Sequence, residues 1–92
     1  MGEATTVTVR GVKLEADPAR MEDYEAIEAM ADMMAAEGAE ALRLSVRWMR
    51  LVLGTDYRRV KDELRKANGG TLTFEDMSGF CTELVEAAGS KN

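Results

Sequence analysis

The chain has 92 residues, of which 12 are basic and 17 acidic, so its formal net charge is −5 at neutral pH. This length is that of a single short domain, and no apolar run reaches the roughly 20 residues of a membrane-spanning helix. The sequence contains no histidine and one cysteine, which removes the commonest general base and argues against a structural zinc site. We therefore expect no enzymatic activity, no metal and no cofactor. With no recognisable export signal, the lone cysteine favours the cytoplasm.

The charge is unevenly distributed along the chain. Residues 1–40 carry three basic and ten acidic side chains, residues 41–66 carry eight and three, and residues 67–92 carry one and four. A basic middle between acidic ends is most simply self-complementary, with acids of the first helix close to the central arginines. A nucleic-acid-binding patch is the alternative interpretation, and the overall acidity argues against it.

The first segment alternates apolar and polar residues in two short runs that Arg10-Gly11 separates. This pattern predicts a β-hairpin over residues 5–16, with the glycine supplying positive φ in a two-residue turn. A hairpin alone is marginally stable in water, so its apolar face is expected to lie on the helices.

A first helix is predicted over residues 18–37. Asp17 suits the N-cap, Pro18 suits the first helical position, and Gly38 is placed to end the helix. Its apolar residues recur at helical spacing and are predicted to form its buried stripe. They are Met21, Tyr24, Ile27, Met30, Ala31 and Met34.

The central helix, predicted over residues 41–53, is the densest apolar run and contains the only tryptophan, Trp48, which we expect to be buried. A continuous strand is the alternative, but the run is longer than a usual strand. Its three arginines, Arg43, Arg47 and Arg50, fall on one helical stripe. A helix that is apolar around most of its circumference is surrounded by others.

Two further helices are predicted over residues 56–67 and 74–88, with Thr55 and Thr73 as N-caps and Gly54 ending the central helix. Residues 89–92 are expected to form a flexible tail. The predicted fold is therefore mainly α, with an N-terminal β-hairpin followed by a compact four-helix domain that spans residues 1–92 as a single unit.

Two possible chemical sites have simpler structural explanations. Cys81 lies on the apolar stripe of the last helix, where a small core residue is expected, and no histidine is present to activate it. The adjacent Glu75 and Asp76 point to different sides of a helix, so capping and the helix dipole account for them better than metal binding.

Methionine is unusually frequent, with seven in the chain. These residues either fill the core or form a yielding apolar surface for a variable partner. Met33 and Met34 are adjacent, so they cannot both face one line of the core. The candidate partner-binding residues are therefore Met30, Met33, Met34, Arg43, Arg47 and Arg50. So much apolar surface on a small chain also predicts a homo-oligomer.

Several segments in a fixed order resemble a known family. They are residues 7–14 (VTVRGVKL) leading into Asp17-Pro18, residues 53–61 (LGTDYRRVK), residues 68–77 (NGGTLTFEDM) and the ending SKN. Together they resemble the tail assembly chaperones of long-tailed phages and of prophages in Gram-positive bacteria. The resemblance spans nearly the whole chain and is strongest over residues 51–92.

The resemblance implies a non-enzymatic protein of the host cytoplasm that is absent from the mature virion. Such proteins bind the tape measure protein, keep its apolar helices soluble and help to deliver tail-tube subunits, without binding nucleic acid or membranes. The alternative function is that of a small regulator or antitoxin from a mobile element, with Arg43, Arg47 and Arg50 as its contact face.

Overall fold

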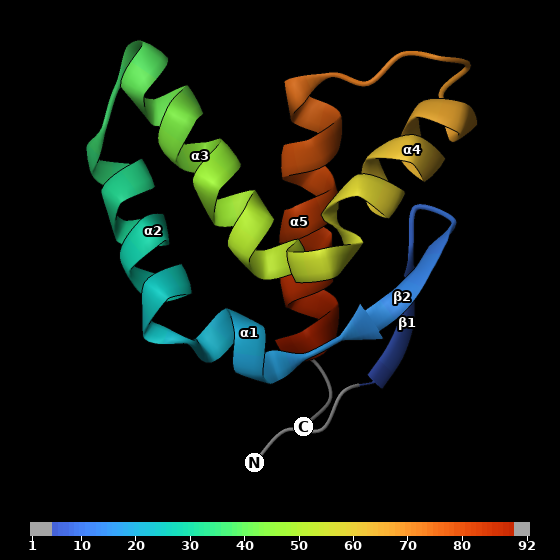
Figure 1. Cartoon of the computed structure of the whole chain (residues 1–92), viewed down its shortest axis with the longest axis horizontal. Helices are drawn as coiled ribbons and strands as arrows, with labels where there is room; N and C mark the ends of the chain where they lie inside the picture. The colour runs from blue at the N-terminus through green and yellow to red at the C-terminus, as the bar shows by residue number, and fades with distance from the viewer. Residues whose placement is uncertain (1–4, 90–92) are drawn as a thin grey trace.

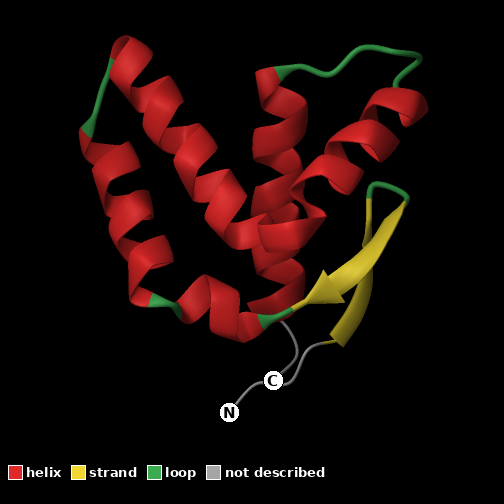
Figure 2. Cartoon of the chain, viewed as in Figure 1, coloured by secondary structure: helices red, strands yellow, loops and turns green. Residues whose placement is uncertain are grey.

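The structure, a computed structural model, describes residues 5–89 as a two-stranded antiparallel sheet followed by helices (Figure 1). The elements are β1 (Thr5–Val9), β2 (Val12–Ala16), α1 (Pro18–Glu22), α2 (Tyr24–Ala35), α3 (Gly38–Leu53), the 3-10 helix η1 (Gly54–Asp56), α4 (Tyr57–Ala67) and α5 (Phe74–Gly89). The predicted mainly α fold with an N-terminal hairpin is confirmed (Figure 2). Of the predicted tail, Gly89 ends α5, and residues 90–92 lie outside the described part of the chain.

The hairpin has the predicted turn. Arg10 and Gly11 both have positive φ, 51° and 83°, as the two central residues of a type I′ turn require. The alternating residues of β2, with Val9 of β1, are buried against the helices. The Arg10 side chain donates from Nε and Nη2 to the Glu83 carboxylate, so the turn is tied to α5.

The core forms where the hairpin, the C-terminal half of α3, α4 and α5 meet, with α5 at its centre (Figure 1). Phe80 and Cys81 of α5 are fully buried, as are Leu53 at the end of α3 and Val60 of α4. Trp48 is 9% exposed, which confirms that it is a core residue.

The first predicted helix is interrupted, contrary to the continuous segment expected over residues 18–37. Asp23 has an extended ψ of 140°, and its carboxylate accepts a hydrogen bond from the Glu25 backbone N–H at 3.0 Å. Aspartate competes with helical backbone in this way, which is why it favours caps over helix interiors. Two helices therefore replace one, and α2 ends at Ala35, before Gly38 begins α3.

α3 ends where the sequence predicts, but the next helix begins differently from the prediction. Gly54 ends the helix, and residues 54–56 form a 3-10 turn, so Thr55 does not act as an N-cap and α4 begins at Tyr57. The Leu53 carbonyl accepts a hydrogen bond from Arg20 Nη1 at 2.8 Å. This cation lies at the negative end of the α3 dipole and fastens α1 to it.

The start of α5 follows the prediction closely. Thr73 Oγ1 accepts from the Asp76 backbone N–H, and the Asp76 carboxylate accepts from the Thr73 N–H, both at 3.0 Å. This reciprocal pair is a capping box. These hydrogen bonds also lower the pKa of Asp76, so capping explains this acidic residue.

Candidate partner-binding surface

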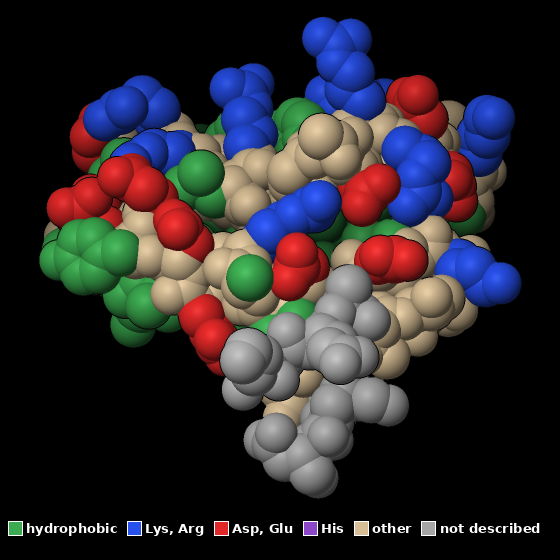
Figure 3. All heavy atoms as spheres, turned by 60° about the horizontal axis from the view of Figure 1, so that its bottom comes forward, with side chains coloured by type: hydrophobic (Ala, Val, Ile, Leu, Met, Phe, Trp, Pro, Cys, Tyr) green, Lys and Arg blue, Asp and Glu red, His purple; other side chains and the backbone are tan. Residues whose placement is uncertain are grey.

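The predicted buried stripe of α2 faces outward. Ala26 and Ala29 are the residues that α2 buries, whereas four large apolar side chains are exposed. They are Tyr24 at 73%, Ile27 at 44%, Met30 at 39% and Met34 at 77%. We call these four residues the outer face of α2. Figure 3 shows hydrophobic side chains on the side of the molecule where α2 lies, bordered by acidic ones.

The physical reason for this inversion is that α2 is apolar around much of its circumference, with only Glu25, Glu28 and Asp32 charged. Either side of the helix therefore has enough apolar surface to pack against α3. Alanines at the contact let α2 approach α3 closely, because interaxial distance depends on side-chain size at the crossing. Side-chain size alone does not decide which face is buried.

The three candidate methionines of α2 separate accordingly. Met33 is half-buried and packs against the core, whereas Met30 and Met34 are on the outer face. Leu42, near the start of α3, is also exposed at 51%. Met34 and Leu42 flank the loop that joins α2 to α3, which is the end of this helix pair farthest from the hairpin (Figure 1), and both side chains are exposed.

The acidic residues of α2 meet one of the central arginines, which was the pairing expected from the charge distribution. Arg47 contacts Glu25 at 3.2 Å and Asp32 at 3.7 Å. Arg43 pairs within its own helix with Glu40, which lowers the pKa of that carboxyl group. Such exposed pairs contribute little to the stability of the fold.

Arg43, Arg47 and Arg50 line a single groove of about 600 Å³, together with Val46 and Leu51. The predicted arginine stripe is therefore present. The groove is lined by α3 alone, so the outer face of α2 and the arginines form two surfaces rather than one site.

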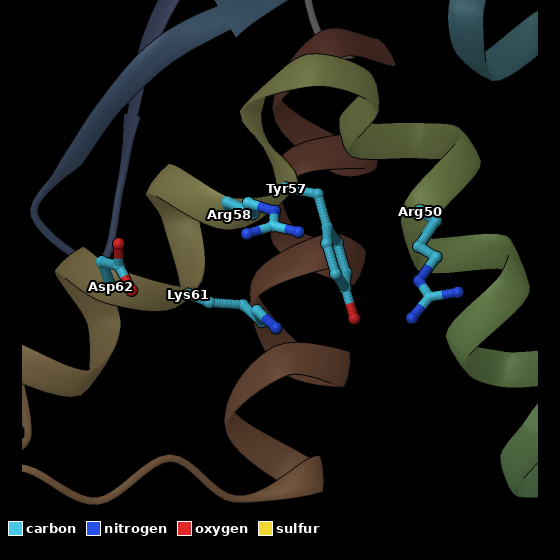
Figure 4. A pocket seen from close by; sticks show the side chains of 5 residues that line it. All are labelled: Arg50, Tyr57, Arg58, Lys61 and Asp62. Carbon is cyan, nitrogen blue, oxygen red and sulfur yellow. The ribbon is translucent and has the colours of Figure 1, made fainter.

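A second pocket, of about 410 Å³, joins α3 to α4 and was not predicted from the sequence (Figure 4). Tyr57 is half-buried and packs against the core. The Arg50 guanidinium carbon lies 5.4 Å from the ring centroid, and Lys61 Nζ lies 4.9 Å from it. In the sequence, Tyr57, Arg58 and Lys61 lie within about one helical turn of each other. This spacing was the signal that could have indicated the pocket.

Metal binding and the chemistry of the single cysteine can be judged from the described residues. Within residues 5–89, no cluster of three or more histidine, cysteine, aspartate or glutamate side chains is placed to hold a metal ion. Cys81 is confirmed as a core residue, and burial raises its pKa to about 12. A thiol so protonated is a poor nucleophile.

Comparison with known proteins adds no relative. No protein-family model, curated protein or solved structure matches this chain. Among residues 5–89, none of the helices combines the length and hydrophobicity needed to cross a lipid bilayer. Functional inference therefore depends on the surfaces described above and on the sequence resemblance.

Proposed function

We propose that this chain is a non-enzymatic phage tail assembly chaperone, which binds the tape measure protein and assists assembly of the tail tube. The observation that supports this function best is the outer face of α2, with its four exposed large apolar residues. Monomeric proteins seldom expose such contiguous apolar surface without a binding role. The order of sequence segments that resembles the chaperone family supports the specific partner.

The chemistry of the outer face suits a long helical client. Met30 and Met34 have flexible, polarizable side chains that adapt to different apolar ridges, while Tyr24 adds a large ring with a polar tip. Such a surface accepts successive segments of one client, each slightly different in shape. In this proposal the chain acts in the host cytoplasm, covers apolar client helices before the tube encloses them, and is absent from the mature virion.

The same surface provides a route to self-association. A homo-oligomer that buries the outer face of α2 between copies would release it when a client binds. Light scattering of the purified chain across micromolar concentrations should give a mass above that of one chain. A monomer mass throughout would remove self-association from the proposal.

The direct test is co-expression with an affinity-tagged tape measure protein, which we expect the gene immediately downstream to encode. The chain should co-purify with the tagged client and increase its soluble fraction. The Ile27→Gln/Met34→Gln variant should bind the client at least about tenfold more weakly, which corresponds to roughly 1.4 kcal/mol of binding free energy, and its recovery should fall as a result.

Thr82→Gln is the matched control, because Thr82 is exposed on α5, away from the outer face. It should leave recovery unchanged, and circular dichroism should show that all variants fold. Equal recovery of the α2 variant and the wild-type chain would contradict the outer face as the client site. Absence of the wild-type chain from the purified client would contradict the chaperone function itself.

The second candidate function is that of a small regulator or antitoxin that binds through Arg43, Arg47 and Arg50. Their common groove is the observation that favours it. Against it, Arg43 and Arg47 are already paired with carboxylates, whose negative charge would oppose a phosphate backbone. Salt-dependent binding of duplex DNA, lost in Arg47→Gln, would favour the regulator over the chaperone.

A further inference from the structure

Three cations around Tyr57 differ from most other arginines of the chain. Arg10, Arg20, Arg43, Arg47 and Arg59 each lie within 4 Å of a carboxylate. Within residues 5–89, the cations with no carboxylate at that distance are Lys13, Arg65, Lys66, Arg50, Arg58 and Lys61. The last three, Arg50, Arg58 and Lys61, line one pocket with Tyr57. We call these three residues the cation cluster.

The arrangement of the cation cluster favours an anion rather than an aromatic ligand. In Figure 4, Arg50 reaches from α3 to one side of the Tyr57 ring, and Lys61 and Arg58 approach from the other. The ring is therefore covered by cations and is not free to stack on a nucleobase. Asp62 lines the same pocket, but among residues 5–89 no carboxylate, that of Asp62 included, lies within 4 Å of these cations, so their charge is left for an external partner.

The distances favour two separate negative charges. Arg50 and Lys61 lie 5.4 Å and 4.9 Å from the ring centroid, so their charges are no more than about 10 Å apart. With the ring between them, one small anion cannot sit midway. Two carboxylates on successive turns of a helix, whose Cβ atoms are about 5–6 Å apart, reach both positions through their flexible side chains.

The groove on α3 continues this pocket, because Arg50 lines both. Its floor includes the apolar side chains of Val46 and Leu51, and Arg43 lies two helical turns before Arg50, roughly 10 Å along α3. An apolar track of this length that ends in unpaired positive charge is complementary to an amphipathic helix with acidic residues at one end.

We propose that the cation cluster binds the acidic end of an amphipathic partner helix whose apolar stripe lies on Val46 and Leu51. Nucleic acid fits less well, because Glu25, Asp32 and Glu40 border the same groove and already neutralise its other arginines. This inference rests on the proposed function and deepens it by specifying the charge of the client helix. It uses α3 and α4, so it is tested separately from the outer face of α2.

The test uses a dye-labelled designed peptide with a leucine stripe and two glutamates on successive turns near its N-terminus, and its glutamine-substituted twin. Fluorescence anisotropy at low ionic strength should show that the acidic peptide binds about tenfold more tightly than its twin. In Arg50→Gln/Lys61→Gln this preference should disappear. Arg65→Gln is the matched control, because Arg65 is exposed on α4 and lies outside the pocket.

Equal binding of the two peptides to the wild-type chain would overturn the inference, as would an equal loss of preference in Arg65→Gln. Tight binding of duplex DNA that only the double variant loses, without peptide preference, would overturn it in favour of a nucleic-acid site. If the peptide preference is absent while the wild-type chain still co-purifies with the tape measure protein, this inference fails and the chaperone function remains. If the preference is present and the client is not recovered, the chaperone function fails.

Discussion

The two helices α2 and α5 use similar apolar sequences in opposite ways. From α5, large side chains such as Phe80 and Leu84 enter the core, and the charged residues Glu83 and Glu86 face outward. From α2, alanines enter the contact with α3, and Ile27 and the other large residues of the outer face meet solvent. The helical spacing of apolar residues predicts both helices. Which side of each helix is buried depends on the elements that pack against it.

This difference separates a part of the molecule that stabilises the fold from a helix that presents an exposed surface. Four elements, β1, β2, α1 and α3, pack against α5, whereas α2 packs mainly on α3. An alanine buries far less apolar area than a leucine or phenylalanine, and burial contributes roughly 25 cal/mol per Å². The part built around α5 therefore holds the fold, and α2 is a weakly held element that presents its outer face.

The largest expected effect comes from emptying the core. Trp48→Ala should destabilise the chain by about 3–5 kcal/mol, because it leaves a cavity among buried neighbours. In so small a domain this change can abolish folding. Urea unfolding followed by circular dichroism measures the loss, and a cooperative transition with an unchanged midpoint would show that Trp48 does not belong to the core.

The next largest effect is expected at the junction of α3 and η1. Gly54 has φ 55° and ψ −129°, a combination that is essentially restricted to glycine. A Cβ there would also lie 2.9 Å from the Arg20 guanidinium. Gly54→Ala should cost about 1–3 kcal/mol in the same unfolding assay.

Gly89→Ala is the control for this change, because a Cβ at that position meets nothing within 4 Å. It should leave the midpoint nearly unchanged. Equal midpoints for the Gly54 and Gly89 variants would contradict the account of the junction.

Cys81 reports on the part of the molecule built around α5. Burial raises its pKa from 9.0 to about 12, so the folded chain keeps the thiol protonated at pH values where the unfolded chain loses it. The resulting stability is fully present below pH 9 and is lost as the pH rises toward 12. Alkylation by iodoacetamide at pH 8.5 should be slow in the native chain and fast in urea. Fast alkylation without urea would show that this part opens readily.

The smallest effect is expected on the outer face. Met34→Ala should change the free energy of unfolding by no more than about 0.5 kcal/mol, because the side chain is 77% exposed. Urea unfolding again provides the measurement. A loss close to that of Trp48→Ala would mean that Met34 is covered, by α2 packing differently or by a second copy of the chain.

Features set by local chemistry were predictable from the sequence. Asp17 caps α1, Thr73 and Asp76 cap α5, Arg10-Gly11 forms the hairpin turn and Gly54 ends α3, because each depends on residues close in the chain. The break at Asp23 also depends on residues close in the chain. It was not predicted, because apolar residues continue at helical spacing on both sides of Asp23 and indicated one continuous helix.

Features set by distant neighbours were not predictable. The outer face of α2 depends on how closely alanines allow it to approach α3, and the cation cluster depends on Arg50 lying across from α4. The arginine stripe of α3 was predicted because its three residues lie on one helix. For its acidic partners on α2, the charge distribution predicted that they lie near the arginines but not which residues pair.

The division between a core around α5 and a weakly held α2 is tested most directly by hydrogen exchange of individual amides in the free chain. Amides in the middle of α5 should exchange only with global unfolding, whereas those of α2 should exchange through smaller openings with a lower free energy. Mass spectrometry or NMR resolves the two helices in one experiment. Protection of α2 equal to that of α5 would contradict the division.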